Sequence, residues 1–364
     1  MVENKWQHFV PQFYFKFFSE DDKNIGIFNL KRQSHFKGAF ENQSAKNFFY
    51  SENVEIEKSF SPLEGKFKDV LKRLILDGFK QLDSRDYFEV LRFITFQFDR
   101  TELSKKASKD YTQKFVENVM KPMMKANKEL REKLSPEDID NVKITHPADF
   151  LYSVLLSLEA NILLTDLVPV LIKNKTEADF IFSDNPIIKY NGIYYSEGHS
   201  FTGYQSPGLL VFFPLNPKLM IMLFDPVYYN IKLEQNNEFS LNDLEDVSKL
   251  NKFQFHNCMK NVYYSDKKSK KGIDLISEEF FSEYSKGENL AQMREIPNWR
   301  GNGNSLLVSS RKSISERIKF NFLKYASPKQ TIATFRDKKL CDLFNEKIKA
   351  IEEMMELKKS KKKN

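Results

Sequence analysis

The chain has 364 residues, of which 41% are hydrophobic and 14% aromatic, including 34 Phe. This composition excludes an intrinsically disordered protein and leaves room for one large domain or two ordinary ones. The formal net charge is +7, but the tail at residues 358–363 carries five positive charges and no negative one. Because little excess charge remains elsewhere, basicity alone is weak evidence for a nucleic-acid partner.

The cysteine content and the hydropathy of the sequence indicate in which cellular compartment the protein is located. Cys258 and Cys341 cannot build a disulfide framework, and the first residues lack the apolar stretch of an export signal. The longest apolar stretch, residues 150–172, contains Glu159 and Asp166, and each would cost roughly 2.5–3.5 kcal/mol inside a bilayer. We therefore expect a cytoplasmic protein with no membrane partner, in which this stretch is a buried core helix.

In chain order, the N-terminal half is predicted to be mainly helical after an aromatic entry segment and a strand at residues 24–30. Ser61-Pro62 is typical of a helix start, and Ser84 is the expected cap of a second helix. The polar, lysine-rich residues 103–134 indicate a long exposed helix with its connection. A short helix at Ser135 and the apolar helix from Phe150 follow.

The C-terminal half is predicted to be mainly strands. Asn191-Gly192 indicates a hairpin between residues 187–190 and 193–195. The further expected elements are strands at 179–182, 209–213, 219–224, 227–233 and 262–264, and helices at 240–259 and 337–357. Helices followed by antiparallel strands predict an α+β fold, with the helical half packed on a mainly antiparallel sheet and a C-terminal helix. We expect one domain at residues 1–265 and a mixed C-terminal extension at 266–364.

The standard signatures of nucleotide, serine-hydrolase, zinc and RNA-binding sites are missing from the sequence. Candidates are therefore polar residues in apolar surroundings. On one continuous helix, Glu159 and Asp166 would lie within about 20° of each other on the apolar face. A carboxylate there needs a partner, and Arg100 or His8 is the expected one for Glu159. The alternative is that both acids form internal ion pairs without a chemical role.

Three further fragments carry polar groups that could perform chemistry. Ser183-Asp184-Asn185-Pro186 follows a strand, although turn formation explains it equally well. His8 and Gln12 lie among aromatic residues, where a histidine is either a base or a satisfied core residue. Gln97 and Arg100 lie at a helix end, where an arginine binds a phosphate or an internal carboxylate.

These fragments, in this order, resemble an uncharacterised bacterial family that is known only as a domain of unknown function. The resemblance covers about residues 5–265, with departures at Phe182 and Asn216, where the family pattern has Thr and Ser. Its motifs are His8–Tyr14, Asn47–Tyr50, Leu63–Gly65, Gln97–Thr101, Ser183–Pro186 and Pro214–Pro217. The resemblance implies that His8, Gln12, Glu64, Gln97, Arg100, Asp184 and Asn185 are motif positions that meet in space.

Together with Glu159, these residues supply an imidazole, carboxylates, amides and a guanidinium. Such a set of groups is suited to the hydrolysis of a phosphodiester. The leading hypothesis is a metal-dependent nuclease acting on RNA or DNA, and the accessory-gene context of the family suggests antiviral defence or toxin roles. The expected catalytic residues are His8, Gln12, Glu159, Asp184 and Asn185. The expected substrate-binding residues are Arg100 and Gln97. A divalent ion, Mg²⁺ or Mn²⁺, is expected to bind Glu64, Glu159 and Asp184. The alternatives are a non-catalytic binding or sensor module with a structural polar network, and a small-molecule transferase, for which no cofactor motif is present.

Overall fold

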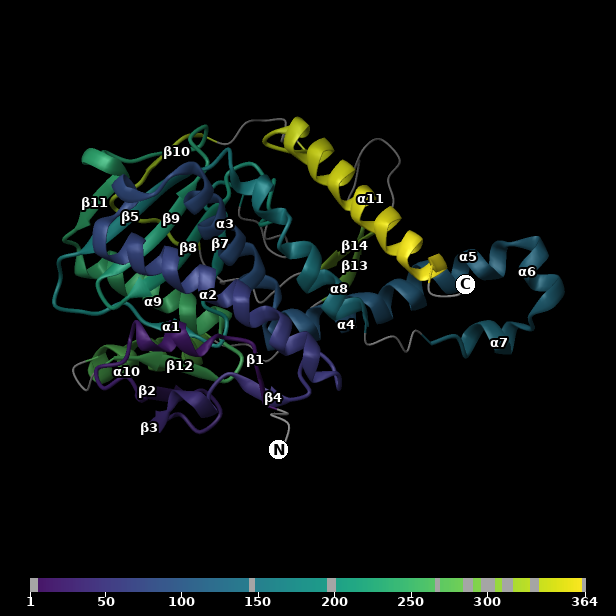
Figure 1. Cartoon of the computed structure of the whole chain (residues 1–364), viewed down its shortest axis with the longest axis horizontal. Coiled ribbons are helices and arrows are strands. Elements are labelled where there is room, and N and C mark those ends of the chain that lie inside the picture. Colours follow the sequence, from purple (N-terminus) through teal and green to yellow (C-terminus); the bar gives the residue numbers. More distant parts are fainter. Residues whose placement is uncertain are drawn as a thin grey trace.

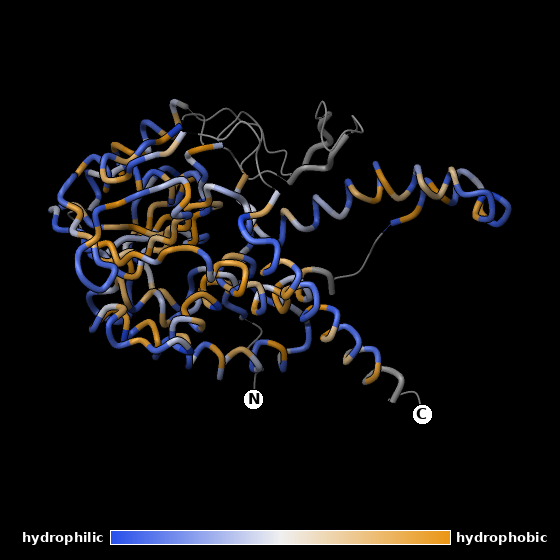
Figure 2. Tube along the Cα trace, turned by 90° about the horizontal axis from the view of Figure 1, so that it is seen from above, coloured by the Kyte–Doolittle hydropathy of each residue, from blue (hydrophilic) through white to orange (hydrophobic). Residues whose placement is uncertain are grey.

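The computed structural model describes residues 6–143, 148–194, 201–265, 269–283, 291–295, 305–309, 317–327 and 334–361. It has the predicted α+β fold, with mostly antiparallel strands and a long C-terminal helix. A body of helices and sheets carries two extensions, the helical arm at residues 102–140 and the C-terminal helix (Figure 1). Figure 2 shows hydrophobic segments concentrated in the body and hydrophilic ones frequent along both extensions.

The elements have the following bounds. The helices are α1 Gln12–Lys16, α2 Val54–Asp77, α3 Ser84–Asp99, α4 Glu102–Phe115, α5 Lys121–Ala126, α6 Lys128–Lys133, α7 Pro136–Asp140, α8 Ala148–Ser157, α9 Leu244–Asn257, α10 Ser269–Glu283 and α11 Lys338–Lys361. The strands are β1 Trp6–His8, β2 Asn24–Asn29, β3 Ser34–Ala39, β4 Ala45–Asn47, β5 Val168–Asn174, β6 Phe182–Ser183, β7 Ile188–Tyr190, β8 Leu210–Asn216, β9 Leu219–Phe224, β10 Tyr229–Asn230, β11 Glu238–Leu241, β12 Asn261–Tyr264, β13 Ala291–Glu295, β14 Ser305–Ser309 and β15 Lys324–Tyr325.

The larger sheet has the strand order β11-β5-β9-β8-β7, and only the β11–β5 pair is parallel. Its strands are buried on both faces, so alternate residues enter two different cores. Leu171, Ile221 and Phe213 point into the first core. Ile172 and Met222, on neighbouring positions, point into the second. The sheet therefore separates the N-terminal helices from α9.

The first core is the part of the fold that positions the candidate site. Helices α2 and α3 contribute Phe67 and Phe93 to it, and they lie against one face of the larger sheet (Figure 1). The N-terminal segment enters the same core through Tyr14, which is fully buried and stacks on Phe213 at 5.4 Å between ring centroids. The two-stranded β1–β4 ribbon and α1 are thereby fixed next to α2.

A smaller antiparallel sheet, in the order β3-β2-β12-β6, lies beside the first core. Ile27 and Tyr263 face that core, whereas Phe28 and Tyr264 face α10 in a third cluster. Gly26 is required in β2 because a Cβ there would lie 2.4 Å from the Tyr264 ring. Helix α10 therefore covers the outer face of the smaller sheet.

Several predicted elements are confirmed and others need correction. The strand pair β8–β9, strand β12, the short helix at Pro136 and the C-terminal helix lie where they were expected. The first long helix begins at Val54, not at Pro62, because the Asn53 side chain accepts the Glu55 N–H and caps it. Pro62 lies inside this helix.

The prediction of one helix over residues 150–172 is wrong. Helix α8 ends at Ser157, a 3₁₀ turn covers residues 160–164, and β5 begins at Val168. An apolar run has no period that separates a buried helix from a buried strand, and Val168, Val170 and Ile172 favour the strand. Glu159 and Asp166 therefore do not share a helix face.

The hairpin predicted at Asn191-Gly192 is also wrong. Strand β7 pairs with β8, and the Asn191 amide donates to the carbonyls of Phe201 and Pro207, so the chain turns away from β7. Tyr195 lies outside the described residues. Residues 227–233 do not extend the sheet, because β10 pairs with β15. Helix α9 begins at Leu244 under the Asp243 cap, since Ser240 belongs to β11.

Residues from the C-terminal extension pack into the second core through Ile318, Phe320 and Leu323. Arg336 then fixes the start of α11, because its guanidinium forms two 2.8 Å bonds to Asp166 and also donates to the carbonyls of Ser206 and Leu163. Among the described helices, none has an apolar run long enough to cross a bilayer.

Replacing Arg336 by Met should lower the free energy of unfolding by about 3 kcal/mol, because it removes both 2.8 Å bonds to the Asp166 carboxylate and the side-chain donor of the Ser206 carbonyl. Lys339→Met, an exposed change three residues away, is the matched control and should stay within about 0.5 kcal/mol of the unaltered protein. Urea denaturation of both variants measures this. Equal stability of the two would contradict the anchoring role.

Candidate functional site

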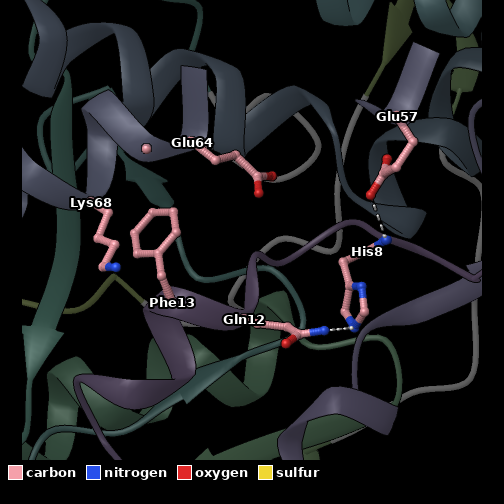
Figure 3. Close-up of a pocket in the computed structure, with 7 residues that line it drawn as sticks. His8, Gln12, Phe13, Glu57, Glu64 and Lys68 are labelled. Carbon is pink, nitrogen blue, oxygen red and sulfur yellow. Dashed lines mark hydrogen bonds between the residues drawn. The ribbon is translucent and has the colours of Figure 1, made fainter. Parts of the chain in front are cut away.

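A pocket of about 340 Å³ lies between the N-terminal segment and α2. Its volume is at the lower end of the range for small-molecule sites. The pocket is lined by His8, Gln12, Phe13, Glu57, Glu64, Gly65 and Lys68 (Figure 3). Glu57, Glu64 and Lys68 are spaced by seven and four residues on α2, so they lie on one helix face. One side of the pocket is thus strongly charged.

Arg100, the C-terminal cap of α3, lies behind the pocket and is fully buried. Its guanidinium donates to the Tyr50 hydroxyl at 2.8 Å, to Glu64 Oε1 at 2.6 Å and to the His8 carbonyl at 2.6 Å. The Phe96 ring lies 4.6 Å from its Cζ. Because all three acceptors belong to the protein, Arg100 joins β1, α2 and the loop before α2 to the end of α3.

His8 presents a neutral imidazole to the pocket. Its Nε2 lies 2.8 Å from the Glu41 carbonyl oxygen, which can only accept, so Nε2 carries the proton and Nδ1 keeps its lone pair. The Gln12 amide nitrogen lies 3.3 Å from the same Nε2. Burial lowers the pKa of His8 below its usual 6.5, against the effect of the Glu41 carbonyl. At neutral pH, Nδ1 is therefore available to accept a proton.

Glu57 lies in the first turns of α2, next to β1. Its Oε1 accepts the backbone N–H of His8 at 3.3 Å, and its Oε2 is buried with no hydrogen-bond partner among the described residues. Burial raises the pKa of Glu57 to about 7, although Arg100 favours the charged form. Near pH 7, about half of the molecules therefore carry a protonated Glu57, which can donate from the buried side of the pocket.

Five of the expected motif residues do meet in this region. His8, Gln12 and Glu64 line the pocket, and Arg100 binds two of them from behind. Gln97 is also buried, and its amide donates to the Phe9 carbonyl at 2.9 Å. Gln97 and Arg100 therefore hold the backbone of the N-terminal segment and do not line the pocket. The structure gives no support to their expected contact with a substrate.

Asp184 and Asn185 lie in a different network, at the turn between α9 and β12. The Asp184 carboxylate accepts the backbone N–H groups of Met259, Lys260 and Asn261 at 2.8, 2.7 and 3.3 Å. Asn185 donates to the Asn257 carbonyl. Burial raises the pKa of Asp184 to about 6, against these three donors. Neither residue lines the pocket of His8, and the geometry is that of a closed turn.

Glu159 has the expected environment but different partners. Its side chain is 16% exposed and pairs with Arg92 at 3.1 Å and with Lys347 of α11. The expectation that Arg100 or His8 would be its partner is wrong, because Arg100 binds Glu64 instead. Asp166 pairs with Arg336. Both acids thus form the internal ion pairs that were the alternative interpretation.

The three acids expected to share a metal ion, Glu64, Glu159 and Asp184, lie in three separate networks. Within the part of the chain that the structure describes, no group of three His, Cys, Asp or Glu side chains is arranged to hold a metal. Binding of Mg²⁺ or Mn²⁺ stays a prediction, which the assays below test directly.

Sequence reasoning missed Glu57 and Lys68. It started the first long helix at Pro62, which left Glu57 in an expected loop and hid its register with Glu64. The signal was present at Asn53, which is followed by Glu55 and Glu57, because a cap with acids in the first turn is typical of a helix start. A helix beginning there places Glu57, Glu64 and Lys68 on one face.

Arg100→Lys should destabilise the protein by about 2 kcal/mol or more, because an ammonium cannot reach three acceptors that a planar guanidinium serves. Arg92→Lys, on the same helix but partly exposed, should cost less than about 1 kcal/mol. Denaturant midpoints measure the difference. If Arg100→Lys were as harmless as Arg92→Lys, the buried fork would not be holding these segments.

Comparisons with known proteins confirm the expected membership of a family of unknown function. No curated protein and no solved structure matches the chain. One family model, described as "Protein of unknown function (DUF4238)", matches residues 6–268, which is well over half of the chain and includes every residue of the pocket. The chain therefore belongs to the DUF4238 family of proteins of unknown function.

Proposed function

We propose that the protein is a nuclease that cleaves RNA by acid–base chemistry in the pocket between β1 and α2. The observation that carries this proposal is that Glu57 and His8 line the same pocket. One pocket holds a carboxyl group whose pKa is raised to about 7 and an imidazole whose pKa is lowered. A carboxyl group that keeps its proton near neutral pH and an imidazole that is neutral there are suited to exchange protons with a substrate.

The steps follow from which group holds a proton. His8 Nδ1 takes the proton of a ribose 2′-hydroxyl, and that oxygen attacks the adjacent phosphorus. The bond from phosphorus to the 5′-oxygen breaks, and protonated Glu57 gives its proton to the departing oxygen. Lys68 places a positive charge at the pocket for the phosphate. Water then opens the cyclic phosphate, with the two groups in reversed roles.

A divalent ion would have to compete for the two pocket carboxylates, because Glu57 is the proposed proton donor and Glu64 is paired with Arg100. We therefore propose that cleavage be assayed with and without Mn²⁺. We propose a cytoplasmic role in antiviral defence or as a toxin. The reason is an association: members of the family look like accessory bacterial genes, and such genes include defence and toxin genes.

A second candidate is a binding or sensor module without catalysis. The observation in its favour is that Arg100 and Gln97, both motif residues, are fully buried and bind the protein's own backbone. A network of that kind fixes a fold and needs no substrate. The two candidates differ in Glu57, which a purely structural network would leave without a chemical task.

Cleavage of a single-stranded RNA should depend on pH in a bell-shaped manner. The rate should rise through an apparent pKa below 6.5, as His8 loses its proton, and fall through one near 7, as Glu57 does. Glu57→Gln should reduce kcat/KM about 10²–10⁴-fold and remove the falling limb. Glu55→Gln is the control and should keep full activity, because Glu55 is exposed, pairs with Lys58 and does not line the pocket. Unchanged cleavage by both Glu57→Gln and His8→Ala would refute the proposal.

Stability gives an independent readout of the same carboxyl group. Because the folded-state pKa of Glu57 is raised above its usual 4.5 to about 7, folding takes up a proton between these values. The stabilising protonated form is fully present below about pH 4.5 and is lost as the pH rises through 7. Glu57→Gln should therefore raise Tm relative to the unaltered protein at pH 8 but not at pH 4.5. An equal Tm difference at both pH values would contradict the raised pKa.

A further inference from the structure

Three lysines and one glutamate form a second charged cluster, at the start of α4. Both Glu102 oxygens are paired, Oε1 with Lys46 and Oε2 with Lys260 at 2.9 Å. Lys105, one turn further along α4, donates to the Phe49 carbonyl and lies over the faces of the Phe49 and Phe150 rings at 4.7 and 5.4 Å. Three ammonium groups thus gather around one carboxylate.

Among the described residues, the positive charge of this cluster exceeds its negative charge. Glu102 is the only carboxylate that forms an ion pair with any of the three lysines among the described residues. Asp184 attracts Lys260, but its oxygens are occupied by backbone N–H groups. Partial burial lowers the pKa of Lys105, and the neighbouring Lys46 lowers it further. Such a group gains free energy from an external anion.

The location connects this cluster to the pocket. Lys46 belongs to β4, next to Ala45, which pairs with His8 across the β1–β4 ribbon. Successive residues of a strand point to opposite faces, so Lys46 emerges on the other side of the ribbon from His8. Glu102 is separated from the buried Arg100 by a single residue. The pocket and the cluster therefore share one rigid frame.

Trp6 of β1 and Phe48, directly after β4, each keep 36% of their surface exposed. Trp6 is two residues from His8 on β1, so it lies on the face of the ribbon that carries His8 and not on the face of Lys46. The lysine cluster is therefore defined by its charges alone, and the choice of a strand as its ligand comes from the neighbouring pocket.

We propose that Lys46, Lys105 and Lys260 form a phosphate-binding subsite that takes a backbone phosphate of single-stranded RNA outside the pocket. This assignment rests on the proposed function for the identity of the strand, since the chemistry of the subsite itself requires only a phosphate. Glu102 competes for the same ammonium groups, so it tunes the affinity of the subsite downward.

The test is binding of a twelve-nucleotide single-stranded RNA with 2′-O-methyl groups, which lacks the attacking hydroxyl, measured over a series of salt concentrations. Lys105→Gln and Lys260→Gln should each weaken binding about fivefold or more, and each should reduce the slope of log affinity against log salt by about 0.7. Glu102→Gln should strengthen binding, because it frees two ammonium groups. Lys37→Gln, which removes an exposed lysine from β3, is the charge-matched control and should change neither quantity appreciably.

Lys105→Gln should weaken RNA binding and Glu102→Gln should strengthen it, whereas unfolding would weaken binding in both variants. The Tm of each variant shows whether it is folded. Equal binding by the lysine variants and the Lys37→Gln control would overturn the subsite, and so would a failure of the unaltered protein to bind. Inorganic phosphate is the second probe. Displacement by millimolar phosphate with no preference for the strand would assign the subsite to a free phosphate group instead. Binding of the strand without cleavage of unmodified RNA would refute the nuclease and leave the subsite intact.

Discussion

A single buried cation constrains the whole candidate site. Arg100 is fully buried, and such a charge is tolerated only if every donor has a partner of good geometry. Its three acceptors come from β1, α2 and the segment before α2, and they lie 36 to 92 positions from Arg100 in the sequence. Meeting this requirement draws the N-terminal segment against α2, so that His8 and Glu57 line one pocket and the Glu57 carboxylate accepts the His8 backbone N–H. The pocket is thus a consequence of satisfying one guanidinium.

The same arrangement sets the electrostatics of the pocket. Arg100 favours the charged form of Glu57, but burial is the larger effect and its pKa rises to about 7. Burial moves the pKa of His8 in the opposite direction, as expected for a base whose charged form is the cation. Glu64 pairs with the guanidinium directly and, as a nearby negative charge, raises the pKa of Glu57 further. The result is a carboxyl group that is partly protonated near neutral pH beside a neutral imidazole, and that is the physical basis of the proposed acid–base role.

Much of the fold could be predicted from the sequence, because alternating apolar residues and capping side chains report local structure directly. Strands β8, β9 and β12 and the short helix at Pro136 are of this kind. The site was predicted in part, since the shared motifs joined His8, Gln12, Glu64, Gln97 and Arg100. Glu57 was missed because its helix begins earlier than Pro62 suggested. Asp184 and Glu159 were assigned to the site because a buried acid looks the same in a sequence whether its partner is a backbone turn, an internal arginine or a substrate.

The central claim is that Glu57 titrates near neutral pH in the folded protein, and it can be measured directly. Carbon-13 NMR of glutamate side-chain carboxyls, with the Glu57 resonance assigned by its loss in Glu57→Gln, follows this one group through a pH titration. The account predicts an apparent pKa of about 7 for Glu57. A value near the usual 4.5 would show a solvated, permanently charged carboxylate and would contradict both the proton-donor role and the proposed chemistry of the pocket.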